Sequence, residues 1–136
     1  MSLPKRRQSG NAMVEFALVF LLFLMIVFGL IEMGRAVWTY NSVAHATRMG
    51  GRHIIVHGSV NPTTPAKLKE AVTKNALGLD PAKIIVTTTP AGPWGRGDFV
   101  QLRVEYPFQF VASPLILAGS PSTMALASHT RVIVGN

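Results

Sequence analysis

Residues 12–31 read AMVEFALVFLLFLMIVFGLI, and Glu15 is the single charged residue in this stretch. A helix of this length rises about 30 Å, which is the thickness of the hydrocarbon core of a bilayer. The composition of the whole chain is also typical of a membrane protein, since 49% of its 136 residues are hydrophobic, 14% are charged and the mean hydropathy is +0.34. The stretch therefore predicts a membrane-spanning helix and excludes a purely soluble enzyme.

The basic residues indicate an orientation across the membrane. The chain has 13 Lys and Arg against 6 Asp and Glu, a formal net charge of +7. Its tightest basic cluster, Lys5 to Arg7, comes directly before the apolar stretch, an arrangement that keeps a short N-terminal segment in the cytoplasm. The other basic residues are scattered and follow no nucleic-acid-binding motif, so we expect membrane lipid but no nucleic acid among the partners.

Glu15 is the unusual residue of the stretch, because an ionised acid within a membrane costs on the order of 3 kcal/mol in insertion experiments. A cleaved secretory signal peptide does not explain it, since the apolar run is too long and the Ala-x-Ala sequence at residues 44–46 lies far beyond it. A plain signal anchor fits the length. In that interpretation, which stays open, Glu15 reaches outward at the headgroup boundary.

The residues around Glu15 follow a definite order: a basic leader, Ser9-Gly10, four residues, then Glu15-Phe16 and the apolar run. This order resembles the class III signal of type IV pilin-like proteins. Residues 8–52 look like the TadE-like branch, the minor pilins or pseudopilins of tight-adherence (Tad) systems. The resemblance implies that a prepilin peptidase cuts between Gly10 and Asn11 on the cytoplasmic side. Glu15, fifth in the mature chain, and Phe16 would then serve assembly and helix register.

Physical reasons support this interpretation. Glycine has no side chain, so the backbone at Gly10 can enter a protease cleft closely. Glu15 could pair with the new amine of Asn11 on a neighbouring subunit, which would offset the cost of each buried charge and set the axial register. Loss of the leader would leave ten basic residues against six acidic ones, a net charge of about +4.

The helix is expected to continue past the membrane to about residue 57. An apolar stripe recurs at alternating steps of four and three residues. It comprises Ile26, Leu30, Met33, Val37, Tyr40 and Ala44. Gly29 and Gly34 would let another helix approach closely. The pair Gly50-Gly51 weakens the helix, so its end falls anywhere from Thr47 to His57.

Two other features of this helix bear on its surroundings. Glu32 and Arg35 stand three residues apart and are expected to pair on the surface. Trp38 lies just past the apolar run. It is either an interfacial aromatic anchor or a side chain that packs against the outer domain.

The sequence predicts three parts: a leader over residues 1–10, the long helix over 11–57 and a small extracytoplasmic domain over 58–136. The fold class is α+β, with one short helix over residues 66–77 that ends at Gly78. Three antiparallel strands are expected over residues 83–89, 99–110 and 123–134. Pro107 should interrupt the middle strand, which places that strand at an edge or bends it. The apolar residues 113–119 would lie on the membrane surface or cover the sheet.

No catalytic constellation is visible, so the chain is not expected to be an enzyme or to hold a cofactor. The absence of cysteine excludes disulfides, Cys-ligated zinc and thiol catalysis. His53 and His57 have the spacing that presents two imidazoles on one helical face. No carboxylate lies nearby in the sequence to complete a site, and the segment is not certain to be helical, so no metal is predicted.

The loop before the middle strand holds two further candidates. Trp94 is a possible contact surface, because aromatic residues anchor interfaces, and packing on the sheet is its alternative. Arg96-Gly97-Asp98 spells the integrin-recognition tripeptide, which we attribute to chance.

The resemblance implies a TadE-like minor pilin or pseudopilin that starts in the inner membrane with its N-terminus in the cytoplasm and its C-terminal domain in the periplasm. After processing it would enter a Tad-type pilus, an adhesion and secretion apparatus outside the cell, with other pilin subunits and the Tad assembly platform as partners. The alternative is an uncleaved single-pass envelope protein that scaffolds a secretion complex. The mature N-terminus distinguishes them, Asn11 in the first case and Met1 or Ser2 in the second.

Overall fold

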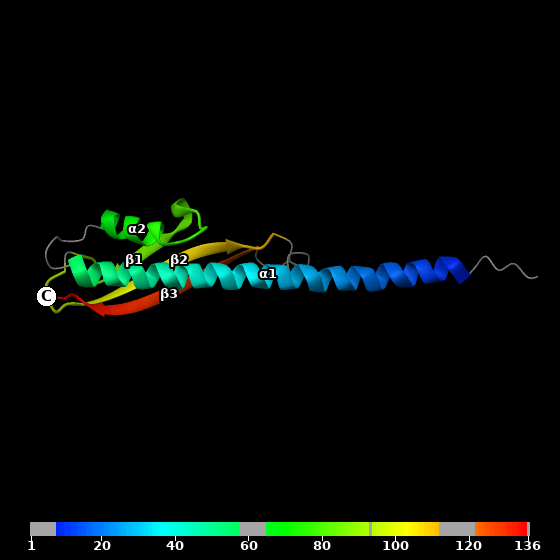
Figure 1. Cartoon of the computed structure of the whole chain (residues 1–136), viewed down its shortest axis with the longest axis horizontal. Helices are drawn as coiled ribbons and strands as arrows, with labels where there is room; N and C mark the ends of the chain where they lie inside the picture. The colour runs from blue at the N-terminus through cyan, green and yellow to red at the C-terminus, as the bar shows by residue number, and fades with distance from the viewer. Residues whose placement is uncertain (1–7, 58–64, 93, 112–121, 136) are drawn as a thin grey trace, which may run out of the picture. The chain divides into compact units, whose positions relative to one another are not determined.

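The computed structural model describes residues 8–57, 65–92, 94–111 and 122–135 (Figure 1). Its elements follow one another in the predicted order and form the predicted α+β fold. They are α1 (Gln8–His57), α2 (Pro65–Lys74), the 3-10 helix η1 (Pro81–Lys83), β1 (Ile85–Thr89), β2 (Phe99–Gln109) and β3 (Thr123–Ile133). The predicted apolar segment 113–119 lies outside the described residues.

Contacts divide the chain into two compact units. The first comprises Met1–Gly34 and Phe110–Ser122, and the second comprises Arg35–Gln109 and Thr123–Asn136. The second unit is therefore larger than the segment 58–136 expected from the sequence, because it includes the C-terminal half of α1. That half of the helix supplies part of the core.

The sheet is an antiparallel meander with strand order β1-β2-β3. Its pairing runs from Ile85↔Glu105 to Thr89↔Gln101 on one side of β2 and from Phe99↔Ile133 to Gln109↔Thr123 on the other. The interruption predicted at Pro107 is wrong, since β2 continues through it and pairs with β3 there. β1 begins opposite Glu105 and does not reach Pro107, so there β2 has one neighbouring strand among the described residues, and a residue without an N–H is tolerated.

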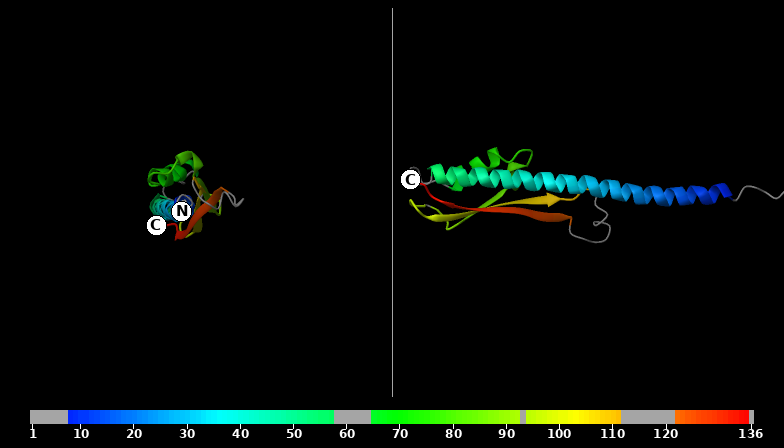
Figure 2. Two further views of the ribbon diagram at one scale, coloured as in Figure 1. Left: turned by 90° about the vertical axis from the view of Figure 1, so that its right-hand side faces the viewer. Right: turned by 60° about the horizontal axis from the view of Figure 1, so that its bottom comes forward.

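The core of the second unit lies between the sheet and the two helices, which both cover the same sheet face (Figure 2). Val100, Leu102 and Val104 point inward from β2 and alternate with more exposed neighbours. The helices contribute side chains spaced three and four residues apart. These buried residues are Val43, Ala46, Thr47 and Ile54 from α1, and Leu68 and Val72 from α2.

The apolar stripe expected on α1 is not the buried face of the second unit. Val37 and Tyr40, two members of that stripe, are 51% and 48% exposed. The buried positions, which start at Thr39 and Val43 and end at Ile54, carry smaller or β-branched side chains. Small side chains let the sheet and α2 approach the helix backbone, whereas the larger apolar side chains point away from the core.

Gly50 and Gly51 lie inside α1, which continues to His57. A Cβ atom at Gly50 would lie 2.6 Å from Cγ2 of Val72 and 2.8 Å from Cδ2 of Leu102. One at Gly51 would lie 3.0 Å from Cγ2 of Thr130 on β3. The glycine pair therefore permits close packing on two sides of the helix and does not end it.

The short helix α2 ends at Lys74, three residues before the predicted end, and a turn follows. Gly78 in this turn has a φ of +73°, which favours glycine. A Cβ atom there would also collide with the indole of Trp38. Trp38 thus contacts the turn after α2 within the second unit, which agrees with packing, one of the two interpretations that the sequence left open.

Candidate functional site

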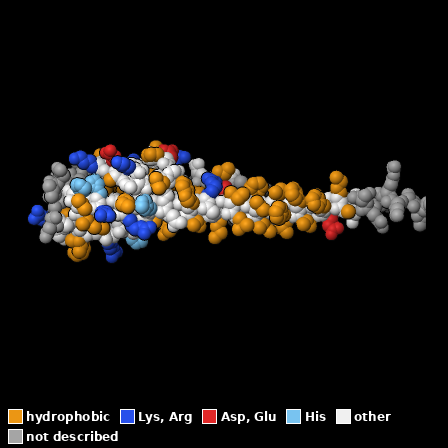
Figure 3. Space-filling model, viewed as in Figure 1, with side chains coloured by type: hydrophobic (Ala, Val, Ile, Leu, Met, Phe, Trp, Pro, Cys, Tyr) orange, Lys and Arg blue, Asp and Glu red, His pale blue; other side chains and the backbone are white. Residues whose placement is uncertain are grey.

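The candidate site is the N-terminal part of α1, whose apolar side chains have few partners among the described residues of the chain. Phe16 and Leu18 are about two thirds exposed, and most other large side chains up to Ile31 are also exposed. Figure 3 shows hydrophobic side chains gathered along this part of the helix. The helix is long and apolar enough to cross a membrane by length and composition. An exposed apolar surface of this extent requires lipid or protein partners.

Glu15 lies on this apolar helix, exposed and beside Phe16, whose ring stacks on Phe20 with centroids 5.8 Å apart. Within the described part of the chain, Glu15 has no hydrogen-bond or ion-pair partner. Gly10 and Asn11 lie in the first turn of α1, about one and a half turns before Glu15. The helix thus brings the predicted processing site and the predicted assembly residues together.

Gly29 and Gly34 are open, because a Cβ atom on either would meet nothing within 4 Å. With 3.6 residues per turn, they lie about 140° apart around the helix axis. They therefore cannot line the same groove for one partner helix. If both serve packing, they contact two different neighbours.

Glu32 is a functional candidate that the sequence did not indicate. It is only 5% exposed, and its Oε1 accepts a hydrogen bond from the backbone N–H of Val111 at 3.0 Å. The prediction that Glu32 lies on the surface is therefore wrong. The spacing of the sequence could have indicated this burial. Glu32 lies seven residues before Thr39 and eleven before Val43, so all three fall on the same face of the helix, which is the buried face.

Replacement of Glu32 by Ala should loosen the backbone at Val111. Its N–H would lose its acceptor, at a cost of about 1–3 kcal/mol, which corresponds to roughly 5- to 150-fold faster amide exchange. Hydrogen exchange of the Val111 amide measures this, and Glu32→Gln, which keeps an acceptor oxygen, should retain more protection. Glu70→Ala on α2 is the control. Equal exchange in the wild type and Glu32→Ala would contradict the assignment.

The comparison with protein families bears on the same helix. Residues 10–52 match the model of the family described as TadE-like protein. Over this segment the chain is similar to the TadE-like family. The match starts at Gly10, includes Gly50-Gly51 and ends inside α1, and it associates the chain with the Tad pilus. None of the curated proteins and none of the solved structures matches the chain.

Trp94 lies in the core, the alternative to a contact surface that the sequence left open. It is 5% exposed, and its Nε1–H donates a hydrogen bond to the carbonyl of Pro90 at 2.9 Å. The neighbouring tripeptide also has a structural role. The Asp98 carboxylate accepts a hydrogen bond from the Gly95 N–H at 2.6 Å, and the Gly97 N–H donates to the carbonyl of Val134.

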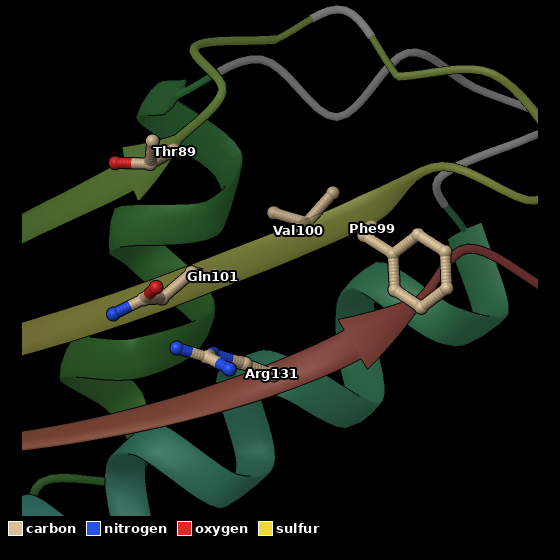
Figure 4. A pocket seen from close by; sticks show the side chains of 5 residues that line it. All are labelled: Thr89, Phe99, Val100, Gln101 and Arg131. Carbon is tan, nitrogen blue, oxygen red and sulfur yellow. The ribbon is translucent and has the colours of Figure 1, made fainter.

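The outer face of the sheet carries a shallow pocket of about 310 Å³. Figure 4 shows Gln101 and Arg131 side by side in it on neighbouring strands, with Thr89 and Phe99 also at its wall. These side chains include no nucleophile with a base. Among the residues described, no group of three or more His, Cys, Asp or Glu could hold a metal ion.

The last turn of α1 brings His53 and His57 together. Their Nδ1 atoms are 3.3 Å apart and their rings meet edge to face, with centroids 4.5 Å apart and an interplanar angle of 81°. Burial lowers the pKa of His53 below its ordinary value, and the charge of His57 lowers this pKa further. Both effects favour the neutral form of His53.

Proposed function

We propose that this protein is a TadE-like minor pilin or pseudopilin, which a prepilin peptidase processes after Gly10 and which joins a Tad-type pilus through α1. The observation that carries the proposal is Glu15, a carboxylate without a partner in the described part of the chain, on a helix surface that is otherwise apolar and exposed. A charge in such surroundings requires a partner from another molecule.

The proposed partner is the amine that cleavage creates at Asn11 of a neighbouring subunit. An amine and a carboxylate inside a membrane or a helix bundle are each costly alone, and pairing offsets both costs. Because the pair forms at one axial position only, it would also fix how far one helix is shifted along the next. The apolar side chains around it would exchange lipid for neighbouring helices during assembly.

The proposed location follows from the order of these segments. The basic cluster Lys5 to Arg7 would stay in the cytoplasm and α1 would cross the inner membrane. The second compact unit, with the sheet and α2, would lie in the periplasm and reach the outside of the cell in an assembled pilus. Other pilin subunits and the Tad assembly platform are the expected protein partners.

The processing step is compatible with the start of α1. Gly10 lies in the first turn, where backbone N–H groups have no intrahelical acceptors, so this turn can open at little cost. A protease that binds an extended chain would then meet a residue without a side chain before the scissile bond. A Cβ atom at Gly10 would meet nothing within 4 Å, so packing within the fold does not require a glycine at this position.

The Gly10→Ala variant tests processing. The wild type should begin at Asn11, whereas nearly all of the variant should keep residues 1–10, because the added methyl group obstructs the protease cleft. The intact mass of the protein isolated from cells that carry a Tad system measures this. Gly29→Ala, a change at another open helical glycine, should be cleaved normally.

A wild-type N-terminus at Met1 or Ser2 would instead favour the uncleaved envelope protein that scaffolds a secretion complex. Normal cleavage of Gly10→Ala would show that glycine is not needed before the scissile bond. In either case the protein in sheared pilus fractions reports separately whether the chain enters a pilus.

A further inference from the structure

The C-terminal turn of α1 presents two imidazoles to one point. His53 and His57 stand four residues apart on a helix that continues to His57. Their Nδ1 atoms are 3.3 Å apart, which is hydrogen-bond distance, so one ring shares its proton with the other. Neither His45 nor His129, the other two histidines of the chain, makes such a contact within the described residues.

We propose that His53 and His57 form a two-histidine site for a divalent transition-metal ion of the Zn²⁺ class. Zn–N bonds are about 2.0–2.1 Å long, and two such bonds from nitrogens 3.3 Å apart meet at about 107°. This is close to the tetrahedral angle that Zn²⁺ adopts in proteins. On metal binding the donor ring would change tautomer, its proton moving from Nδ1 to Nε2, so that both rings stay neutral, bind the ion through Nδ1 and carry their proton on Nε2.

One feature of the surroundings favours this site over a pair of ordinary surface histidines. His53 is only partly exposed, so packing restricts its ring and less conformational entropy is lost on binding.

The described residues around the two histidines supply no further metal ligand. His53 lines an open pocket of about 340 Å³ together with Lys67, Glu70, Ala71 and Lys74 of α2. The two lysines raise the local positive potential, which Glu70 offsets in part. No third protein ligand is present in the part of the chain that the structure describes, so water would complete the coordination. We therefore expect weaker binding than at a structural zinc site with four protein ligands.

Metal binding would stabilise the C-terminal turn of α1 against fraying. The last carbonyls of a helix have no intrahelical N–H partners, so its final turn frays most readily. An ion held by His53 and His57 links the start of that turn to its end. The turn lies next to the close packing of Gly50 against α2 and the sheet.

Zn²⁺ titration of the full chain tests the proposal. The protein is purified in detergent without a polyhistidine tag, stripped with a chelator and titrated by calorimetry in a buffer that does not bind metal. The wild type should bind one Zn²⁺ per chain. His53→Ala and His57→Ala should each weaken binding at least about tenfold, the loss that even outer partners of a metal ligand produce.

His45→Ala is the matched control, because His45 is an exposed histidine on the same helix without a second imidazole one turn away. It should bind Zn²⁺ like the wild type. The ring resonances of His53 and His57 should shift together on Zn²⁺ addition, which a merely structural role would not produce. Unchanged affinity in His57→Ala, a variant at the exposed end of the helix, or no saturable binding by the wild type, would overturn the proposal.

Discussion

A Glu15→Ala chain should be inserted and cleaved like the wild type and yet be absent from sheared pili. The change removes an ionised group whose insertion costs on the order of 3 kcal/mol, so the variant should enter the membrane at least as readily. It also removes the proposed partner of the Asn11 amine on the next subunit. That amine would remain buried without a counter-charge, a situation that costs about 3–5 kcal/mol and is equivalent to more than a hundredfold loss of assembly.

The experiment compares the variant in membrane and pilus fractions, with the mature N-terminus determined in each. Met13→Ala, a change of an exposed apolar side chain half a turn away, is the control for loss of packing alone. Glu15→Gln keeps the shape and loses the charge, so it should behave like Glu15→Ala if charge pairing decides assembly. Normal incorporation of Glu15→Ala into pili would refute the pairing.

The second large effect is expected at Gly50. A Cβ atom there would lie 2.6 Å and 2.8 Å from side-chain carbons of Val72 and Leu102, closer than carbon atoms approach without displacement. Overpacking of this kind costs about 1–3 kcal/mol for Ala and more for Val. Because domains are stable by only about 5–15 kcal/mol, Gly50→Val should remove a large share of the stability of the second unit.

Thermal unfolding followed by circular dichroism measures this effect. Gly34→Ala is the matched control, because a Cβ atom at Gly34 meets nothing, and Ala favours a helix over Gly by about 1 kcal/mol. Gly51→Ala should fall between the two, with closest contacts of 3.0 Å and 3.1 Å. An increase in the melting temperature of Gly50→Ala as large as that of Gly34→Ala would show that the helix does not approach α2 this closely.

The sequence predicts the elements well where a local pattern determines them. β2 and β3 alternate inward and outward side chains, so the predicted ends lie within one residue of the observed ones. The apolar stretch and the order of residues around Gly10 and Glu15 led to the TadE-like resemblance, which the match over residues 10–52 confirms. Cleavage, the role of Glu15 and the location of the chain stay predictions.

The sequence-based predictions are wrong or incomplete where contacts between distant parts of the chain determine which side chains are buried. The buried face of α1 follows the shape of α2 and the sheet, so Val43 and Gly50 are buried while the larger Tyr40 is not. Glu32 is buried because the backbone after β2 returns to it, far along the sequence. Of the two interpretations of Trp94, only the structure selects burial in the core, where the Pro90 carbonyl accepts the hydrogen bond of its indole N–H. Local periodicity places Glu32 in line with the buried face of α1, but it does not report the partners in any of these contacts.

The N-terminal part of α1 is exposed and apolar, whereas its C-terminal part packs against the sheet and α2. This difference limits where genes for such proteins can recombine. A crossover near Gly34 would exchange the apolar segment and leave the sheet with the helix residues that fit it. A crossover at His57 would instead pair a foreign helix with this sheet, and the new helix would need small residues at positions 50 and 51 to be accommodated. The apolar segment should therefore tolerate exchange more readily than the helix segment after it, which must fit Val72, Leu102 and Thr130.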